Sequence, residues 1–255
     1  MSLETIKQQL RQVRLSHASR EIDTVVEKHK KAVNTAWVSE LLEREIDSRR
    51  ENTIRLRIKK AGFPELTSLE NFDWNFNPEI GEARIRELAT LKFIEENLIA
   101  LFLGPPGVGK THLALAIGVL AAQQGHSVYW ASAKKLSNQI LIHRQRNTMD
   151  QFFKKVLSAK LWIVDDWGVV TMGREVAEEV FDLLDRRKHQ AAMILTSNRD
   201  VSEWGEVFPD PVIANATIDR IFDRAKVVLF KGQSYRLKGR IKNRDREIDN
   251  VGIQT

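Results

Sequence analysis

The chain contains no cysteine among its 255 residues, which excludes disulfide bonds, thiolate metal sites and cysteine nucleophiles. Its six histidines show no spacing typical of metal ligands. No segment stays apolar for long enough to span a bilayer, and the N-terminus lacks the basic and apolar stretches of a signal peptide. We therefore expect a cytoplasmic protein that has no membrane partner.

Glycine and proline are both missing between Leu3 and Ala61. Apolar residues recur in this stretch at helical spacing, and Gly62-Phe63-Pro64 interrupts the pattern. The sequence therefore predicts a small N-terminal all-helical domain over residues 1–62 and a second domain over residues 63–255.

Acidic residues are outnumbered, with 34 Asp and Glu against 40 Lys and Arg, so the net charge is +6. Such an excess favours a polyanionic partner. It is concentrated near the C-terminus, where ten Lys and Arg lie between Arg220 and Arg246 against only Asp223 and Asp245. A solvated basic tail is the alternative interpretation of this run.

One segment matches G-x-x-x-x-G-K-[ST], the pattern of loops that hold nucleotide phosphates. A strand-like stretch, residues 97–103, precedes it, and a helix-like stretch begins at His112. In such a loop backbone N–H groups surround the β-phosphate, the lysine reaches the β- and γ-phosphates, and the threonine hydroxyl binds Mg²⁺. The predicted nucleotide-binding residues are Gly104, Pro105, Pro106, Gly107, Val108, Gly109, Lys110 and Thr111.

Strand-like and helix-like segments alternate through the rest of the chain. This alternation predicts an α/β fold in which helices cover both faces of a parallel five-stranded sheet. Before the phosphate loop, the periodicity predicts one continuous helix from Glu82 to Glu96. The predicted strands are residues 97–103, 127–130, 161–164, 192–196 and 227–230.

Polar side chains follow two of these strands directly. Asp165 and Asp166 end the third strand, and Asn198 follows the fourth. Because parallel strands present their carboxyl ends at one edge of a sheet, these groups should lie near the phosphate loop. We predict that Asp165 joins Thr111 at Mg²⁺, and that Asp166 and Asn198 activate and hold the attacking water. Solvated acids and an ordinary Ser-Asn turn are the alternatives.

Arg220 is the remaining candidate for the hydrolytic site. An arginine delivered by a neighbouring subunit stabilises the charge on the transferred phosphoryl group. Its spacing alone leaves a second interpretation open, an ion pair on a helix surface with Asp219 or Asp223.

With these residues assembled, the chain resembles the IstB-like transposition helper proteins of insertion sequences, which are AAA+ ATPases related to the DnaC-like helicase loaders. Besides the phosphate loop, the likeness rests on runs spread over nearly the whole chain: Ser68–Trp74 (SLENFDW), Ile85–Leu91 (IRELATL), Ile194–Arg199 (ILTSNR), Ser202–Phe208 (SEWGEVF) and Ser234–Lys238 (SYRLK).

The resemblance implies roles for residues already singled out. Gly104–Thr111 would be the Walker A loop, Asp165-Asp166 the Walker B pair and Asn198 the sensor 1 residue. Arg220 would be the arginine finger, so the ATPase site would lie at the interface of a homo-oligomer. The segment from Phe72 to Phe76 would be the linker that folds near the adenine.

Two features depart from the family pattern. Many members carry Asp-Glu where this chain has Asp165-Asp166, and the shorter carboxylate predicts slow hydrolysis. Only 35 residues follow Arg220, and they are too polar to form the helical lid common among AAA+ proteins. We therefore expect no lid domain and assign no sensor arginine.

The resemblance implies an ATP- and Mg²⁺-dependent ATPase that binds double-stranded DNA with little sequence preference, oligomerises on it and recruits or stimulates the cognate transposase. A DnaC-like loader of a replicative helicase is the alternative, and a nucleotide-gated binding module without turnover is a second one. A small-molecule phosphotransferase is a more distant third. Candidate DNA contacts are Arg44, Arg49, Arg50, Arg55, Arg57, Lys59, Lys60, Lys134, Lys135, Arg144, Arg146 and the tail from Arg236 to Arg246.

Overall fold

The structure is a computed structural model and describes residues 2–28 and 36–238. The chain divides into two compact units, Met1–Leu56 and Arg57–Thr255. The division falls inside one long helix, α3 (Ala36–Ala61), whose end lies next to the predicted domain boundary. Within the described residues, no helix combines the length and the apolar character that crossing a bilayer requires.

The N-terminal unit is helical. It contains α1 (Leu3–Gln12), α2 (Ser16–Lys28) and most of α3. Ser2 caps α1 by accepting a hydrogen bond from the backbone N–H of Thr5, as expected for a serine before a first helical turn. Its small core gathers Ile6, Leu10, Val13 and Leu42.

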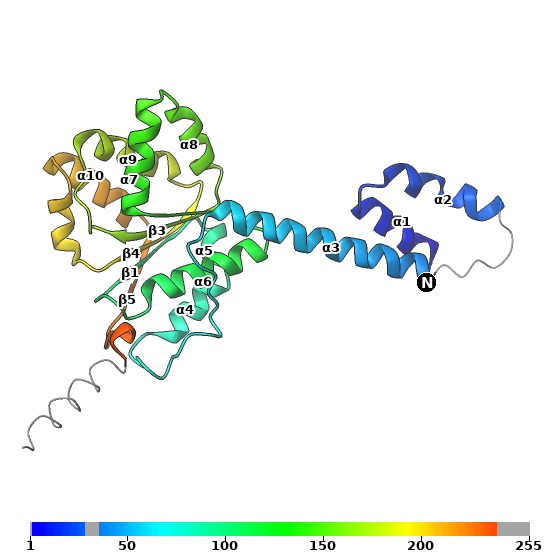
Figure 1. Cartoon of the computed structure of the whole chain (residues 1–255), viewed down its shortest axis with the longest axis horizontal. Helices are drawn as coiled ribbons and strands as arrows, with labels where there is room; N and C mark the ends of the chain where they lie inside the picture. The colour runs from blue at the N-terminus through cyan, green and yellow to red at the C-terminus, as the bar shows by residue number, and fades with distance from the viewer. Residues whose placement is uncertain (1, 29–35, 239–255) are drawn as a thin grey trace, which may run out of the picture. The chain divides into compact units, whose positions relative to one another are not determined.

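A parallel five-stranded sheet forms the centre of the larger unit, as predicted (Figure 1). The strand order is β2-β3-β4-β1-β5, and every pair of neighbours is parallel. The carboxyl ends of all strands therefore meet at one edge, which is where open α/β sheets bind ligands. The strands are β1 (Ile99–Leu103), β2 (Val128–Ser132), β3 (Leu161–Trp167), β4 (Ala192–Ser197) and β5 (Ala225–Leu229).

Helices cover both faces of this sheet, again as predicted (Figure 1). One face packs against α7 (Ala133–Gln145), α8 (Met149–Leu157), α9 (Arg174–Arg187) and α10 (Pro211–Phe222). The other packs against α4 (Glu82–Ala89), α5 (Lys92–Glu95) and α6 (Lys110–Gln123). Two 3₁₀ segments, η1 (Val201–Val207) and η2 (Tyr235–Leu237), complete the described chain. Only η2 follows β5 there, so the described residues form no helical lid.

The predicted continuous helix from Glu82 to Glu96 is wrong. The chain breaks between α4 and α5 because Leu91 adopts the left-handed conformation, with φ 63°. This conformation costs a non-glycine residue about 1–2 kcal/mol. After the turn, α5 buries Phe93 and Ile94 in the apolar cluster on this face of the sheet.

Candidate functional site

The phosphate loop connects the carboxyl end of β1 to the first turn of α6, the arrangement that a phosphate site requires. Gly107 and Gly109 both adopt positive φ, 81° and 106°. A Cβ atom at Gly107 would lie 2.0 Å from Ser234 Oγ, and one at Gly109 would lie 2.5 Å from Phe72 Cε2. Both positions therefore require glycine, because two segments contact the loop closely. One is the segment after β5, which contains Ser234, and the other is the segment Phe72–Phe76, which we call the aromatic linker.

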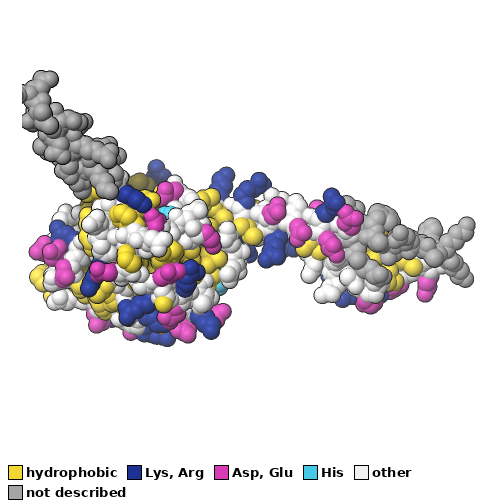
Figure 2. Space-filling view, turned by 90° about the horizontal axis from the view of Figure 1, so that it is seen from below, with side chains coloured by type: hydrophobic (Ala, Val, Ile, Leu, Met, Phe, Trp, Pro, Cys, Tyr) yellow, Lys and Arg dark blue, Asp and Glu magenta, His cyan; other side chains and the backbone are white. Residues whose placement is uncertain are grey.

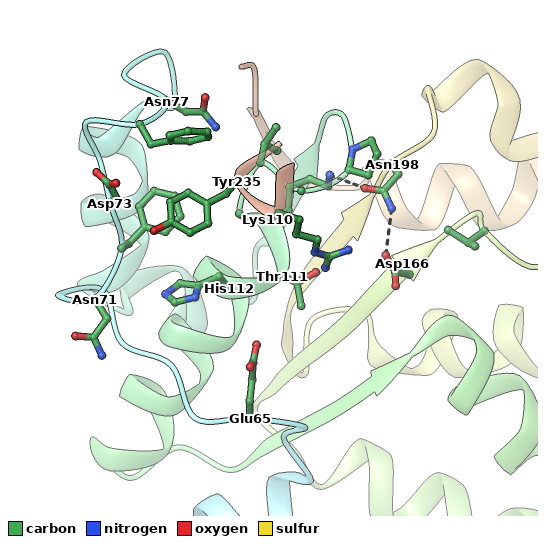
Figure 3. Close-up of a pocket in the computed structure, with 18 residues that line it drawn as sticks. Glu65, Asn71, Asp73, Asn77, Lys110, Thr111, His112, Asp166, Asn198 and Tyr235 are labelled. Atoms are coloured by element: carbon green, nitrogen blue, oxygen red, sulfur yellow. Dashed lines mark hydrogen bonds between the residues drawn. The ribbon is translucent and has the colours of Figure 1, made fainter. Parts of the chain in front are cut away.

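Lys110 is buried at the mouth of the loop and uses its three donors within the protein. Its Nζ donates to the carbonyl oxygens of Gly104 and Pro105, both at 2.7 Å, and to Asn198 Oδ1 at 2.6 Å (Figure 3). Burial lowers the Lys110 pKa to about 8, against the opposing effect of Asp166 and Asp165. When a phosphate enters, its oxygens would therefore replace the carbonyl oxygens of Gly104 and Pro105 as hydrogen-bond acceptors for Lys110.

This lysine predicts a pH dependence of nucleotide binding. Its pKa is about 8 in the free chain, and an anionic phosphate beside it stabilises the charged form. Above that pH, binding must therefore take up a proton, and we expect the affinity to fall by up to about tenfold for each further pH unit. Titration calorimetry with a non-hydrolysable ATP analogue measures this, and buffers of different ionisation enthalpy report the proton. An affinity that stays constant up to about pH 10 would contradict the expectation.

Thr111 and Asp165, the two predicted magnesium ligands, are in direct contact. Thr111 Oγ1 donates to Asp165 Oδ1 at 2.8 Å, and the hydroxyl of Thr196 donates to the same oxygen at 2.5 Å. No group of three or more His, Cys, Asp or Glu side chains in the described residues could hold a metal by itself. One hydroxyl and one carboxylate suit Mg²⁺, which binds proteins through one or two side chains and completes its shell with water and substrate phosphates.

Asp166 sits in a strained backbone conformation at the end of β3. Its φ is 55°, and the pairing of β3 with β4 shifts register between Val164 and Trp167. The shift leaves Asp165 buried and turns Asp166 outward, so adjacent residues face different surroundings. Partial desolvation in the wall of the cavity, followed by the charge of Asp165, raises the Asp166 pKa, whereas a hydrogen bond from Asn198 lowers it. Strain of this kind gathers at functional sites.

Asn198 connects the two charged groups of the site. Its Oδ1 accepts from Lys110, and its Nδ2 donates to Asp166 Oδ1 at 3.2 Å (Figure 3). Asn198 directly follows β4, and Asp166 comes from β3, the neighbouring strand. The sheet therefore brings together the lysine, the acid and the amide that the sequence pointed to separately.

A cavity of about 420 Å³ opens in front of these residues. Its other wall comes from the aromatic linker and the segment after β5, with Phe72, Phe76 and Tyr235 among the lining side chains (Figure 3). Phe76 and Tyr235 meet edge to face, 5.0 Å between ring centres. The volume and the aromatic wall fit a nucleotide whose phosphates lie on the loop.

Asn77 fastens the two segments of this wall to each other. Its side chain donates to the backbone oxygen of Gln233 at 2.9 Å and accepts from the N–H of the same residue at 3.0 Å. Gly232 lies directly beside it, since a Cβ there would be 2.2 Å from Asn77 Oδ1. Sequence reasoning missed Asn77, because a single asparagine in a polar stretch carries no signal of a partner 156 residues away.

Arg236 is the second residue that sequence reasoning missed at this site. It lies in η2 and lines the cavity, where its positive charge lowers the pKa values of Lys110 and Asp166. The sequence predicts no lid and therefore no sensor arginine, so it assigns Arg236 to the basic tail of candidate DNA contacts. The signal that could have identified Arg236 is the run Ser234–Lys238, which contains it and is one of the runs that carry the family resemblance. The rest of that tail, including Arg240 and Arg246, lies outside the described residues.

Arg220 does not line the cavity. It lies in α10, and its Nε donates to Asp185 Oδ1 of α9 at 2.6 Å while Nη1 donates to Asp219 Oδ2 at 3.0 Å. The ring of Phe181 lies 5.8 Å from its guanidinium carbon. In the single chain Arg220 thus forms a surface ion pair, with Asp185 and Asp219 rather than Asp223.

Comparison with known proteins adds an independent observation. The profile described as IstB-like ATP binding protein matches residues 5–243. An ATP-binding protein of insertion sequence IS21 from Pseudomonas aeruginosa is 37% identical over 235 residues, 91% of this chain and 89% of that protein. One of insertion sequence IS5376 from Geobacillus stearothermophilus is 36% identical, covering 82% and 83%. The crystal structure of the DnaC helicase loader has a similar fold, with TM-score 0.51, 23% identity, and coverage of 62% and 98%.

Proposed function

The chain belongs to the family of IstB-like ATP-binding proteins, and from this premise we propose that it is an ATP-driven helper of transposition. In this proposal it binds double-stranded DNA with little sequence preference, oligomerises on it in the ATP state and recruits or stimulates the cognate transposase. Hydrolysis then loosens the assembly. The observation that carries the proposal is the chain of contacts from Lys110 through Asn198 to Asp166, next to the Thr111–Asp165 pair.

Each side chain of this site has a defined task in hydrolysis. Lys110 leaves its loop carbonyls for the β- and γ-phosphates, and Thr111 and Asp165 would hold Mg²⁺. When bound, that ion neutralises charge on the phosphate oxygens. Asp166 accepts the proton of the attacking water, and Asn198 holds that water against the γ-phosphate. The raised pKa of Asp166 suits a base that must first take up a proton and then release it.

Two arginines would stabilise the negative charge that develops around the γ-phosphate during hydrolysis. Arg236 acts within its own chain, since it already lines the cavity. Arg220 acts on the nucleotide of a neighbouring protomer, since it does not line the cavity of its own chain and its side chain is partly exposed. Loss of the γ-phosphate would remove the group that joins the two protomers, which gives a switch between assembled and separate states.

The Lys110→Ala variant tests this function. A hydrogen bond to a charged group is worth about 1.5–3 kcal/mol, so we expect ATP affinity to fall about 10- to 150-fold. ATP-dependent DNA binding should disappear at ATP concentrations that saturate the wild type. Fluorescence anisotropy of labelled duplex DNA, with and without ATP, measures it. Tight DNA binding by Lys110→Ala irrespective of nucleotide would contradict the proposal.

A helicase loader is the second candidate, because the fold is similar to that of the DnaC helicase loader. The names of the sequence relatives favour transposition, since these proteins are assigned to insertion sequences. Stimulation of strand transfer by a transposase encoded next to this chain would support the first function. Stable co-purification with a replicative helicase, without such stimulation, would support the second.

A further inference from the structure

Two stretches of the chain carry cations and no carboxylate. No Asp or Glu occurs between Glu51 and Glu65, and none occurs between Glu96 and Asp150. The structure brings these stretches together at the end of α3 and the start of α7: Lys135 Nζ lies 3.8 Å from the position that a Cβ atom of Gly62 would occupy. Positive charge therefore gathers where no acidic residue of either stretch can neutralise it.

Four exposed lysines lie at these two helix ends, and we call them together the lysine surface: Lys59, Lys60, Lys134 and Lys135. Among the described residues, none of the four has a carboxylate within ion-pair distance. Arg144, another candidate DNA contact, differs in this respect, because it pairs with Glu179 at 2.7 Å and with Glu175 at 3.5 Å. Arg144 is thus already neutralised, whereas the four lysines are not.

The helix macrodipole disfavours cations at the positions of Lys134 and Lys135. Both lie in the first turn of α7, which contains no acidic residue and is capped by Ser132. Cations near a helix N-terminus oppose the helix macrodipole and destabilise the helix. Lys135 is also held over the ring of half-buried Trp130, 4.9 Å from the ring centre. Of these two lysines, only Lys135 has such a partner among the described residues, so the charge of Lys134 breaks the helix rule without a compensating contact, which indicates a functional position.

We propose that the lysine surface binds the phosphate backbone of duplex DNA. The inference rests on the proposed function and names the contact surface that the proposed function leaves open. Lysine ammonium groups act as point charges, which suit phosphate oxygens and carry no fork geometry for reading bases. Four such contacts fit binding with little sequence preference. Figure 2 shows Lys and Arg side chains in dark blue along the long helix α3, with Asp and Glu side chains in magenta among them. The last turn of α3 supplies Lys59 and Lys60.

The experiment compares two double variants of the full chain. In Lys134→Ala/Lys135→Ala the lysine surface loses two charges. The matched control is Lys154→Ala/Lys155→Ala, which removes two adjacent exposed lysines from the last turn of α8, where the macrodipole favours cations. DNA affinity is measured by anisotropy on a random-sequence duplex with a non-hydrolysable ATP analogue, over a range of salt concentrations.

We expect the first variant to bind DNA about 60-fold more weakly at about 0.1 M salt, since counterion release contributes about 8-fold for each phosphate contact there. The slope of log affinity against log salt should become smaller by about 1.8. The control should change neither value. ATP affinity should stay at the wild-type value in both variants, which shows that both are folded, so misfolding does not explain the loss of DNA binding.

Equal losses in the two variants would overturn the lysine surface, because net charge alone would then account for binding. Unchanged DNA binding in the first variant would overturn it as well, while ATP-dependent binding by the wild type would leave the proposed function standing. A wild-type protein that binds no duplex DNA in any nucleotide state would overturn both.

Discussion

Replacement of Arg220 by alanine is expected to lower the rate of ATP hydrolysis by about 10³- to 10⁵-fold, the effect of removing an arginine finger. The affinity of the protein for ATP should stay near the wild-type value, because Arg220 does not line its own cavity. Phosphate release in the presence of DNA measures the first quantity, and a fluorescent ATP analogue measures the second. A fall in both together would instead place Arg220 at its own nucleotide.

A mixing experiment distinguishes action in trans from a local role of Arg220. Arg220→Ala keeps an intact ATP pocket, and Lys110→Ala keeps an intact Arg220, so each protein should be inactive alone. In an equal mixture, about a quarter of the interfaces join the intact pocket of one protein to the intact arginine of the other. Activity should therefore recover on mixing. A mixture as inactive as its components would mean that the ion pair with Asp185 is the whole role of Arg220.

Arg186 provides the matched control for this prediction. Like Arg220 it pairs with a carboxylate, Asp182 at 2.8 Å, and its guanidinium lies over a phenylalanine ring, that of Phe153 at 4.9 Å. Exposed pairs of this type contribute about 0–1 kcal/mol to stability, so Arg186→Ala should fold normally. Its hydrolysis rate should equal that of the wild type. An equal loss in Arg186→Ala would show that the effect comes from the helix surface and not from a finger.

Local patterns were sufficient to predict most of the fold and to predict that Lys110, Asp166 and Asn198 lie close together. Each strand is a short apolar run, and Asp165, Asp166 and Asn198 directly follow such runs. In a parallel sheet the carboxyl ends of the strands meet at one edge, so residues distant in sequence could be placed together before any contact was known. The structure joins Lys110, Asn198 and Asp166 by hydrogen bonds at this edge.

The features that could not be predicted depend on contacts between distant residues that leave no periodic signal. Asn77 bonds to Gln233, and Arg220 bonds to Asp185, which is 35 residues away and not among the partners that the spacing suggested. Arg236 reaches the cavity because the chain after β5 folds back over the phosphate loop, where the N–H of Tyr235 donates to the carbonyl oxygen of Gly107 at 2.9 Å. From the sequence alone, the high density of Lys and Arg near the C-terminus assigns Arg236 to a basic tail instead.

Asp166→Asn is expected to lower the rate of ATP hydrolysis by about 10²- to 10⁴-fold, the usual contribution of a general base. Asparagine tolerates the left-handed conformation at this position as aspartate does, and its amide has almost the same shape. ATP affinity should stay the same or rise, because a negative charge near the phosphates is removed. Single-turnover hydrolysis measures the rate. In the wild type, the same rate should fall as the pH drops through the raised pKa of Asp166.

The comparison with Asp166→Glu separates the chemical role of this carboxylate from its backbone conformation. Glutamate keeps the carboxylate and extends the side chain by one methylene, but it tolerates a φ of 55° less well than aspartate or asparagine does. We therefore expect Asp166→Glu to be less stable than the wild type by about 1 kcal/mol and still to hydrolyse ATP far faster than Asp166→Asn. If Asp166→Asn instead turned over ATP at the wild-type rate, Asp166 would not be the base. ATP-dependent DNA binding without appreciable hydrolysis in all three proteins would identify a nucleotide-gated binding module, in which bound ATP alone controls assembly.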